Sequence, residues 1–173
     1  IGAIPYVLKK VKMPIYGTPL TMGLLENKLK EHNLGKVDMN IVRAGDKVKL
    51  GKMECEWIRA NHSIPDSCSL AIKTPLGVVF HTGDFKVDFT PISGDTIDLH
   101  RIAEIGKKGV LAMIGESTNV LRPGYTMSES KVGETFNRIF AAQQDNRIII
   151  ATFASNVHRI QQVINSAEVY NRK

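Results

Sequence analysis

The stretch GVVFHTGDFKVDF, residues 77–89, decides how the rest of the sequence is interpreted. Residues 78–80 form an apolar run that is typical of a buried strand, and the run ends in a polar turn that contains Asp84. A carboxylate at the C-terminal tip of a buried strand either caps a turn or binds a ligand. The other polar residues that the fold brings to the same place determine which of the two applies.

Composition indicates an ordinary globular protein. The chain has 173 residues, of which 43% are hydrophobic and 23% are charged, and this profile suits one domain or slightly more. No apolar stretch is long enough to span a bilayer and no signal peptide is recognisable, so we expect a cytoplasmic protein with no membrane partner. The net charge of +6 favours an anionic partner such as nucleic acid, although a basic solvated surface would explain it as well.

Two types of region follow one another along the chain. A helix is predicted over residues 18–33, and five short segments rich in Val, Ile and aromatic residues then predict a mostly antiparallel sheet, at 39–43, 47–50, 53–60, 67–74 and 77–82. A helix over 96–107 and a buried strand over 109–114 complete this part of the chain.

The last fifty residues alternate helix, strand and helix in the style of a parallel α/β unit. Thr126 and Glu129 predict a capping box for the first helix. An apolar strand follows at 147–153, and then a helix at 156–167 with Ile160 and Ile164 facing inward. We place a domain boundary near Arg122, which gives one domain at 1–122 and the start of a second at 123–173.

Two strand exits carry residues that could bind a metal. His62 follows the segment that ends near residue 60, and Asp84 follows the segment that ends near residue 82. If consecutive strands are neighbours in the sheet, these exits lie at one sheet edge, where a neutral imidazole and a carboxylate make half of a zinc site. The plainer interpretation is a hydrogen-bonded loop histidine and a turn aspartate.

The motifs together resemble a known family. HSIPDS at 62–67, HTGDFKVDFTP at 81–91, GESTN at 115–119, TMSES at 126–130 and ATFASNVHRIQQVI at 151–164 are similar, in order, to a central segment of ribonuclease J. Ribonuclease J is a β-CASP nuclease of the metallo-β-lactamase superfamily. The resemblance implies an α/β fold, with part of an αββα sandwich followed by the start of a β-CASP domain.

The same resemblance implies an enzyme that hydrolyses phosphodiester bonds of single-stranded RNA with two zinc ions, or alternatively manganese. By resemblance, His62 is a terminal ligand of one metal and Asp84 bridges both. Glu116 matches an acidic residue that orients a ligand histidine, although many relatives have Asp there. A loop cap beside Thr118 is the alternative role for Glu116.

The segment FASNVHR also has a meaning independent of the family. A predicted strand ends at Phe153 and a helix begins at Ser155 or Asn156, and such helix starts bind phosphate readily. Ser155, Asn156 and His158 are therefore candidates for RNA contacts. Otherwise, Ser155 or Asn156 only caps the helix and His158 packs at the domain interface.

The family's His-x-His-x-Asp-His metal motif does not occur in this sequence. We therefore expect an internal piece of a longer protein, with His62 and Asp84 as its only ligands, that by itself binds metal weakly and cuts no RNA. By resemblance, the whole protein forms dimers or tetramers, with itself or with a paralogue. The competing functions are a metal-free RNA-binding or scaffold paralogue and a small-ester hydrolase, and the balance of endonuclease and 5′-3′ exonuclease activity is left open.

Overall fold

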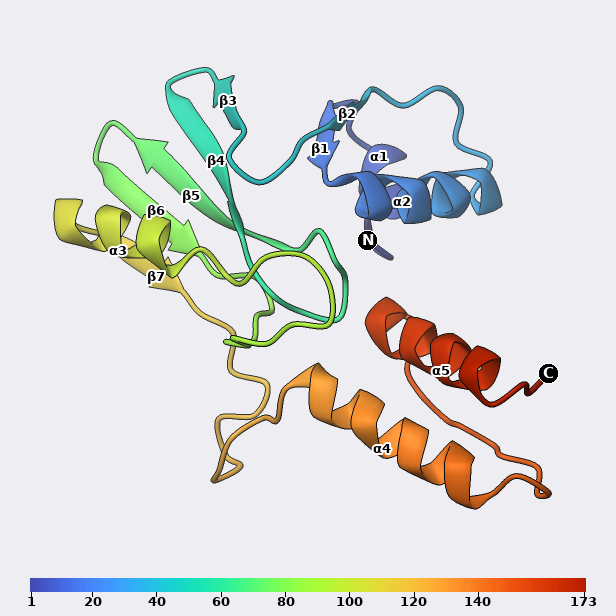
Figure 1. Cartoon of the computed structure of the whole chain (residues 1–173). Coiled ribbons are helices and arrows are strands. Elements are labelled where there is room, and N and C mark those ends of the chain that lie inside the picture. Colours follow the sequence, from blue (N-terminus) through green and yellow to red (C-terminus); the bar gives the residue numbers. More distant parts are fainter.

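Two sheets and five helices make up the computed structural model, which describes residues 1–173 (Figure 1). The smaller sheet pairs β1 (Ile15–Gly17) in parallel with β2 (Met39–Ile41). The larger sheet has the order β3-β4-β5-β6-β7, with bounds Lys47–Leu50, Met53–Arg59, Cys68–Thr74, Gly77–His81 and Ala112–Ile114. The helices are α1 (Ile4–Leu8), α2 (Pro19–Glu31), α3 (Leu99–Lys108), α4 (Glu129–Ala142) and α5 (Val157–Val169).

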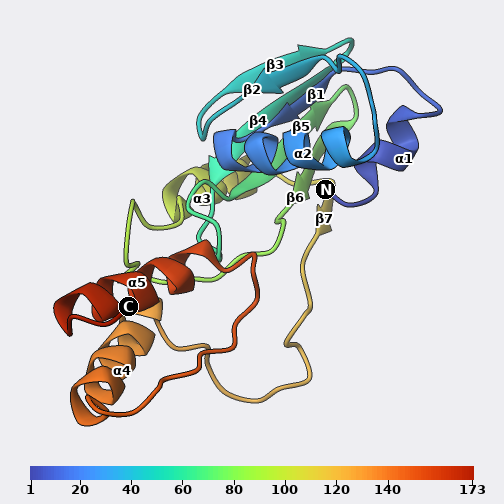
Figure 2. The same cartoon turned by 90° about the vertical axis from the view of Figure 1, so that its right-hand side faces the viewer.

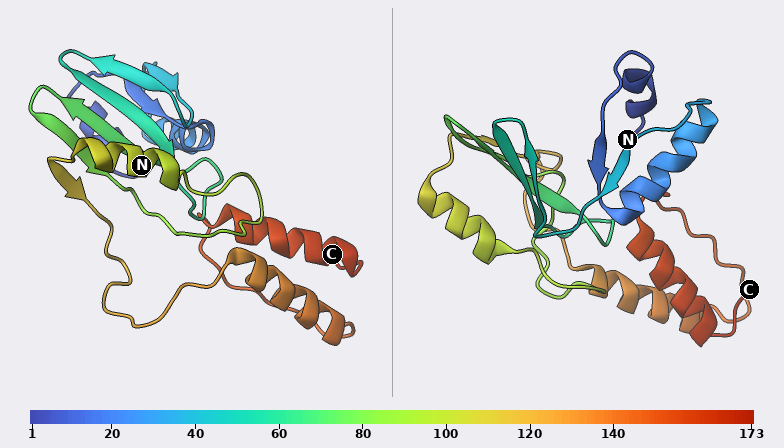
Figure 3. Two further views of the ribbon diagram at one scale, coloured as in Figure 1. Left: turned by 60° about the vertical axis from the view of Figure 1, so that its left-hand side comes forward. Right: turned by 90° about the horizontal axis from the view of Figure 1, so that it is seen from above.

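The two faces of the larger sheet are covered by different elements. Ile58, Ala71 and Phe80, one from each of β4, β5 and β6, pack against Ile105 of α3. Because side chains alternate along a strand, Trp57 points to the opposite face, where a second cluster includes Tyr16 of β1 and Val42, which follows β2. Figure 3 shows α3 and the β1–β2 unit on opposite sides of the sheet.

A third apolar cluster completes the layers. Met22, Leu25 and Leu29 lie one helical turn apart on α2 and pack with Leu8 against the smaller sheet. The order of layers is therefore helix, sheet, sheet, helix. The mixed α/β fold predicted from the sequence is confirmed.

The strand directions in the larger sheet determine which loops lie at the same edge. β4 and β6 are both antiparallel to β5, so they run in the same direction, and β7 is parallel to β6. The C-terminal ends of β4, β6 and β7 therefore lie along the same edge of the sheet, the edge that runs across the strand ends.

α4 and α5 form a separate helical pair beyond this edge (Figures 1 and 2). The hydroxyl of Ser166 on α5 donates to Asn137 Oδ1 on α4 at 2.8 Å. None of the three apolar clusters includes a residue of either helix.

Some predicted elements differ from the structure. The segment at 39–43 does not join the antiparallel sheet, because β2 pairs with β1 in the smaller sheet. The strand predicted as buried at 109–114 is β7, which is exposed along its length. It is the outermost strand of the larger sheet, and α3 covers β4, β5 and β6.

The C-terminal third shows three further differences. Residues 147–153 form no strand, because they pair with no other strand of the chain, and Phe153 is 82% exposed. Ser128, not Thr126, is the N-cap of α4, since its hydroxyl accepts the N–H of Ser130. Ile160 and Ile164, predicted to face inward, are exposed, because no apolar surface of the chain covers that side of α5.

No helix is both long and apolar enough to cross a membrane.

The cluster under α3 predicts where stability is concentrated. Ile58 is only 2% exposed, so Ile58→Ala should lower the free energy of unfolding by about 2–5 kcal/mol through lost burial and a residual cavity. Urea unfolding followed by circular dichroism measures the change. Leu76→Ala is the control, because Leu76 is 86% exposed and its truncation should change the free energy by less than about 0.5 kcal/mol. Equal losses for the two variants would contradict this placement of the core.

Candidate functional site

Three loops meet where β4, β6 and β7 end. The loop after β4 carries His62, the turn after β6 carries Asp84, and the segment after β7 carries Glu116. The first two loops are joined by a bridge between Asn61 and Lys86, in which the Lys86 N–H donates to the Asn61 carbonyl at 2.7 Å. The predicted convergence of the His62 and Asp84 exits at one sheet edge is therefore observed.

The turn that carries Asp84 requires a glycine before it. Gly83 has a φ of +60°, in the left-handed region that residues with a Cβ rarely adopt. A Cβ at this position would also lie 3.3 Å from the carbonyl oxygen of Cys68. His81 is part of the same turn, because its Nδ1 accepts the Gly83 N–H at 2.9 Å.

Thr82 joins the β6 exit to the β7 exit. Its hydroxyl accepts the Glu116 N–H at 3.1 Å and donates to the Gly83 carbonyl at 2.7 Å. Its own N–H donates to the Ile114 carbonyl at 3.0 Å. Thr82 is 7% exposed, so this buried side chain keeps the backbone before Asp84 next to the backbone of Glu116.

A pocket of about 640 Å³ opens at this edge and continues to the start of α5. All six residues predicted for the site line it: His62, Asp84, Glu116, Ser155, Asn156 and His158. Residues far apart in the sequence therefore share one cavity. Their individual roles stay predictions.

Glu116 shows the loop-capping role, and its role toward a ligand histidine stays a prediction. Its Oε2 accepts the Thr118 N–H at 2.8 Å, so it caps its own loop. Its pKa is lowered, mainly by the hydrogen bonds from Thr118 and in smaller part by the nearby charge of His62. Glu116 is thus close enough to His62 for an electrostatic interaction.

The α5 end of the pocket shows the capping arrangement. Asn156 is the N-cap of α5, and its Oδ1 accepts the Arg159 N–H at 3.1 Å. His158 is 8% exposed, and its Nδ1 lies 3.3 Å from the Ser93 hydroxyl. Burial lowers the pKa of His158, and the negative charge of Glu129 offsets part of this effect. His158 therefore packs against the Ser93 loop, and both side chains line the pocket.

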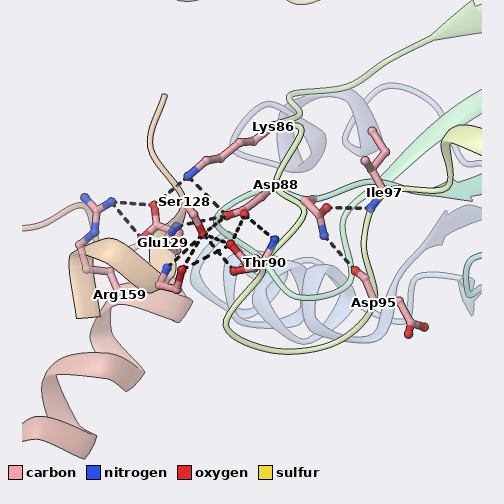
Figure 4. Close-up of polar contacts among 10 residues, drawn as sticks. Lys86, Asp88, Thr90, Asp95, Ile97, Ser128, Glu129 and Arg159 are labelled. Atoms are coloured by element: carbon pink, nitrogen blue, oxygen red, sulfur yellow. Dashed lines mark hydrogen bonds and ion pairs between the residues drawn. The ribbon is translucent and has the colours of Figure 1, made fainter. Parts of the chain in front are cut away.

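A polar cluster between the sheet and the helical pair was missed by the sequence interpretation (Figure 4). Asp88 Oδ2 accepts the Ser128 hydroxyl at 3.0 Å and the Glu129 N–H at 3.1 Å. Glu129 forms an ion pair with Arg159 at 2.8 Å. Lys86 Nζ lies 3.7 Å from Asp88 and 3.6 Å from Glu129.

The buried carboxylate of this cluster is kept ionised by its partners. Asp88 is 5% exposed, and burial alone would raise its pKa. Hydrogen bonds from Ser128, Thr90 and Glu129, together with the charge of Lys86, outweigh burial and lower the pKa. The motifs at 81–91 and 126–130 contained these residues, but their spacing in the sequence does not show that they touch.

The candidate metal ligands make an incomplete set within this chain. A catalytic zinc takes about three protein ligands plus water. No group of three or more His, Cys, Asp or Glu side chains here is placed to hold a metal ion. His62 and Asp84 have suitable donor atoms on a shared pocket, so they fit as two members of a larger set.

Comparison with known proteins gives a consistent result. Residues 145–173 match the family described as "Ribonuclease J, beta-CASP domain". Over its whole length the chain is 44% identical to "Ribonuclease J" of Helicobacter pylori strain J99, 47% identical to "Ribonuclease J" of Synechocystis and 46% identical to "Ribonuclease J2" of Bacillus subtilis. It covers 25%, 27% and 31% of these relatives.

A solved structure supports the fold. A protein of unknown function from Enterococcus faecalis aligns with a TM-score of 0.67 at 17% identity, over 88% of this chain and 39% of that protein. This likeness shows a shared fold. The resemblance inferred from the motifs is confirmed by the sequence relatives, each of which the chain matches over a quarter to a third of its length.

Thr82 gives a test of the connection between the β6 and β7 exits. Thr82→Val should lower the free energy of unfolding by about 0.5–1.5 kcal/mol, because the hydroxyl's hydrogen bonds with the Glu116 N–H and the Gly83 carbonyl are lost. Thr82→Ser keeps the hydroxyl and should lie closer to the parent. Urea denaturation of both variants decides, and a valine variant as stable as the serine variant would contradict the role given to this hydroxyl.

Proposed function

We propose that this chain, which matches a segment of ribonuclease J along its whole length, forms one wall of the active-site cleft of a metal-dependent ribonuclease. One observation carries the proposal: His62, Asp84 and Glu116 leave three strands at one edge and line one pocket. The reaction is hydrolysis of phosphodiester bonds in single-stranded RNA, as an endonuclease, a 5′-3′ exonuclease or both.

The donor atoms suit the roles that the resemblance implies. His62 offers one imidazole nitrogen at a time, as a terminal ligand does, while Asp84 has two oxygens that could each face a different cation. Two zinc or manganese ions bound there would activate a water molecule and neutralise charge that develops at phosphorus. Glu116, whose pKa is lowered by its Thr118 hydrogen bonds, remains a negative charge beside His62.

The carboxylates that line the pocket favour the binding of cations before the binding of RNA. Asp88 and Glu129 have cationic partners in Lys86 and Arg159, whereas Asp84 and Glu116 form no ion pair within this chain. An RNA phosphate would meet two uncompensated carboxylates. The excess of basic residues lies elsewhere on the chain, so cations are needed at this point of the cleft before a phosphate can approach.

The α5 side of the pocket supplies candidates for holding RNA. Ser155 is exposed at the start of α5, and its hydroxyl can donate to a phosphate oxygen. The oxygen of Asn156 is used in the helix cap, which leaves its amide NH₂ as a donor. His158 is better suited to fixing α5 against Ser93 than to binding, because it is buried.

Replacing Asp84 in the full-length protein that contains this chain tests the catalytic assignment. Asp84→Asn keeps the shape of the side chain but removes its charge. We expect the cleavage rate of a 5′-labelled single-stranded RNA to fall by more than about 100-fold, since loss even of groups that only orient metal ligands costs about 10–100-fold. Asp145→Asn, at an exposed loop position outside the pocket, is the matched control and should cleave like the parent. Equal rates for the two variants would refute the assignment.

Metal content of the 173-residue chain tests whether the set of ligands is incomplete. After equilibration with Zn²⁺ or Mn²⁺ and desalting, inductively coupled plasma mass spectrometry should find almost no metal, because two ligands do not retain an ion. His62→Ala should leave this low content unchanged. One or two ions retained by the parent chain and lost from this variant would mean that other residues complete the site.

A further inference from the structure

The loop that carries His62 is tied to the start of a helix. Asp66 follows His62 by four positions, and its Oδ2 accepts the N–H of Leu20 at 2.8 Å. Leu20 is in the first turn of α2, where backbone N–H groups have no partner within the helix. The N-cap residue Thr18 makes no side-chain cap of its own, so the carboxylate of Asp66 takes that place.

The loop that carries Asp84 is tied in the same way. Asp88 follows Asp84 by four positions, and its Oδ2 accepts the N–H of Glu129, the first residue of α4, at 3.1 Å. The hydroxyl of Ser128 donates to the same oxygen at 3.0 Å. Figure 4 shows this carboxylate between the loop and the helix start.

Both connections use a strong type of contact. A carboxylate at a helix N-terminus forms charge-assisted hydrogen bonds and interacts favourably with the helix dipole. Each helix belongs to a different part of the molecule from the larger sheet: α2 packs on the smaller sheet, and α4 belongs to the helical pair. Each loop is therefore fixed at one end by its strand and, four residues beyond its site residue, by a helix.

We propose that Asp66 and Asp88 are positioning residues, which fix the His62 and Asp84 loops relative to each other by docking each on a helix start. Neither acts on substrate directly. The inference rests on the proposed function, because positioning has a catalytic meaning only if His62 and Asp84 bind the metals.

The two carboxylates differ in a way that makes the proposal testable. Asp66 uses one oxygen, and its buried Oδ1 has no hydrogen-bond partner. Asp88 uses both, because its Oδ1 accepts the Thr90 N–H at 3.0 Å while Oδ2 accepts from Ser128 and Glu129. An asparagine at 66 can keep the bond to Leu20 through its carbonyl. An asparagine at 88 must turn an NH₂ group toward at least one existing donor.

The test uses Asp66→Ala, Asp66→Asn and Asp88→Asn in the full-length protein that contains this chain. Hydrogen–deuterium exchange measures the order of residues 62–66 and 84–90, and competition with a chelating dye measures the affinity for Mn²⁺. We expect faster exchange in the affected loop and a 10–100-fold loss of Mn²⁺ affinity for Asp66→Ala and Asp88→Asn. Asp66→Asn should stay within a few-fold of the parent in both measurements.

Asp98→Ala is the matched control. Asp98 also caps a helix, since its side chain accepts the Arg101 N–H at the start of α3 at 2.9 Å, but it does not line the pocket. Its loss should lower the unfolding temperature without changing exchange in either loop or Mn²⁺ affinity. If Asp88→Asn does not fold, Ser128→Ala removes one of the bonds to Asp88 Oδ2 and should give a smaller change in the same direction.

The outcomes separate this inference from the proposed function. The inference is overturned if Asp66→Ala and Asp88→Asn, or Ser128→Ala in place of the latter, behave like Asp98→Ala. It is also overturned if Asp66→Asn loses as much affinity as Asp66→Ala. Asp84→Asn is measured in parallel: if it leaves Mn²⁺ affinity and cleavage unchanged, the proposed function fails, and faster loop exchange in Asp66→Ala and Asp88→Asn would then support only a structural docking role.

Discussion

The direction of the strands in the larger sheet is the constraint on which the candidate site depends. Because β5 is antiparallel to both β4 and β6, and β7 is parallel to β6, three loops leave the sheet at one edge. Reversing any one of these strands would send its loop to the opposite edge. His62, Asp84 and Glu116 therefore owe their common pocket to the pairing pattern and not to closeness in the sequence.

The two walls of the pocket are held together by a different kind of interaction. The layers of the sandwich are packed by apolar clusters, but none of these clusters reaches α4 or α5. The helical pair is attached instead through Asp88 and Lys86, which contact Ser128 and Glu129 at the start of α4. Hydrogen bonds and ion pairs depend on direction more than apolar contacts do, so this attachment fixes orientation as well as distance.

Local patterns predicted most of the elements, and the six site residues predicted from the motifs all lie on the pocket. The errors occur where a property depends on distant parts of the chain. The apolar run at 147–153 predicts a strand, yet a strand exists only when it has a partner to pair with. Likewise, Asp88 and Glu129 are 41 residues apart, and no local pattern shows that one caps the other's helix.

The charge state of Asp88 sets the pH range over which the attachment of the helical pair persists. Its hydrogen bonds and the charge of Lys86 lower the pKa in the folded protein despite burial, which acts in the opposite direction. A carboxyl with a lowered folded pKa stabilises the fold fully above its unfolded pKa, and this contribution is lost as the pH falls through the folded value. The attachment therefore keeps its full strength at neutral pH and weakens only in acid.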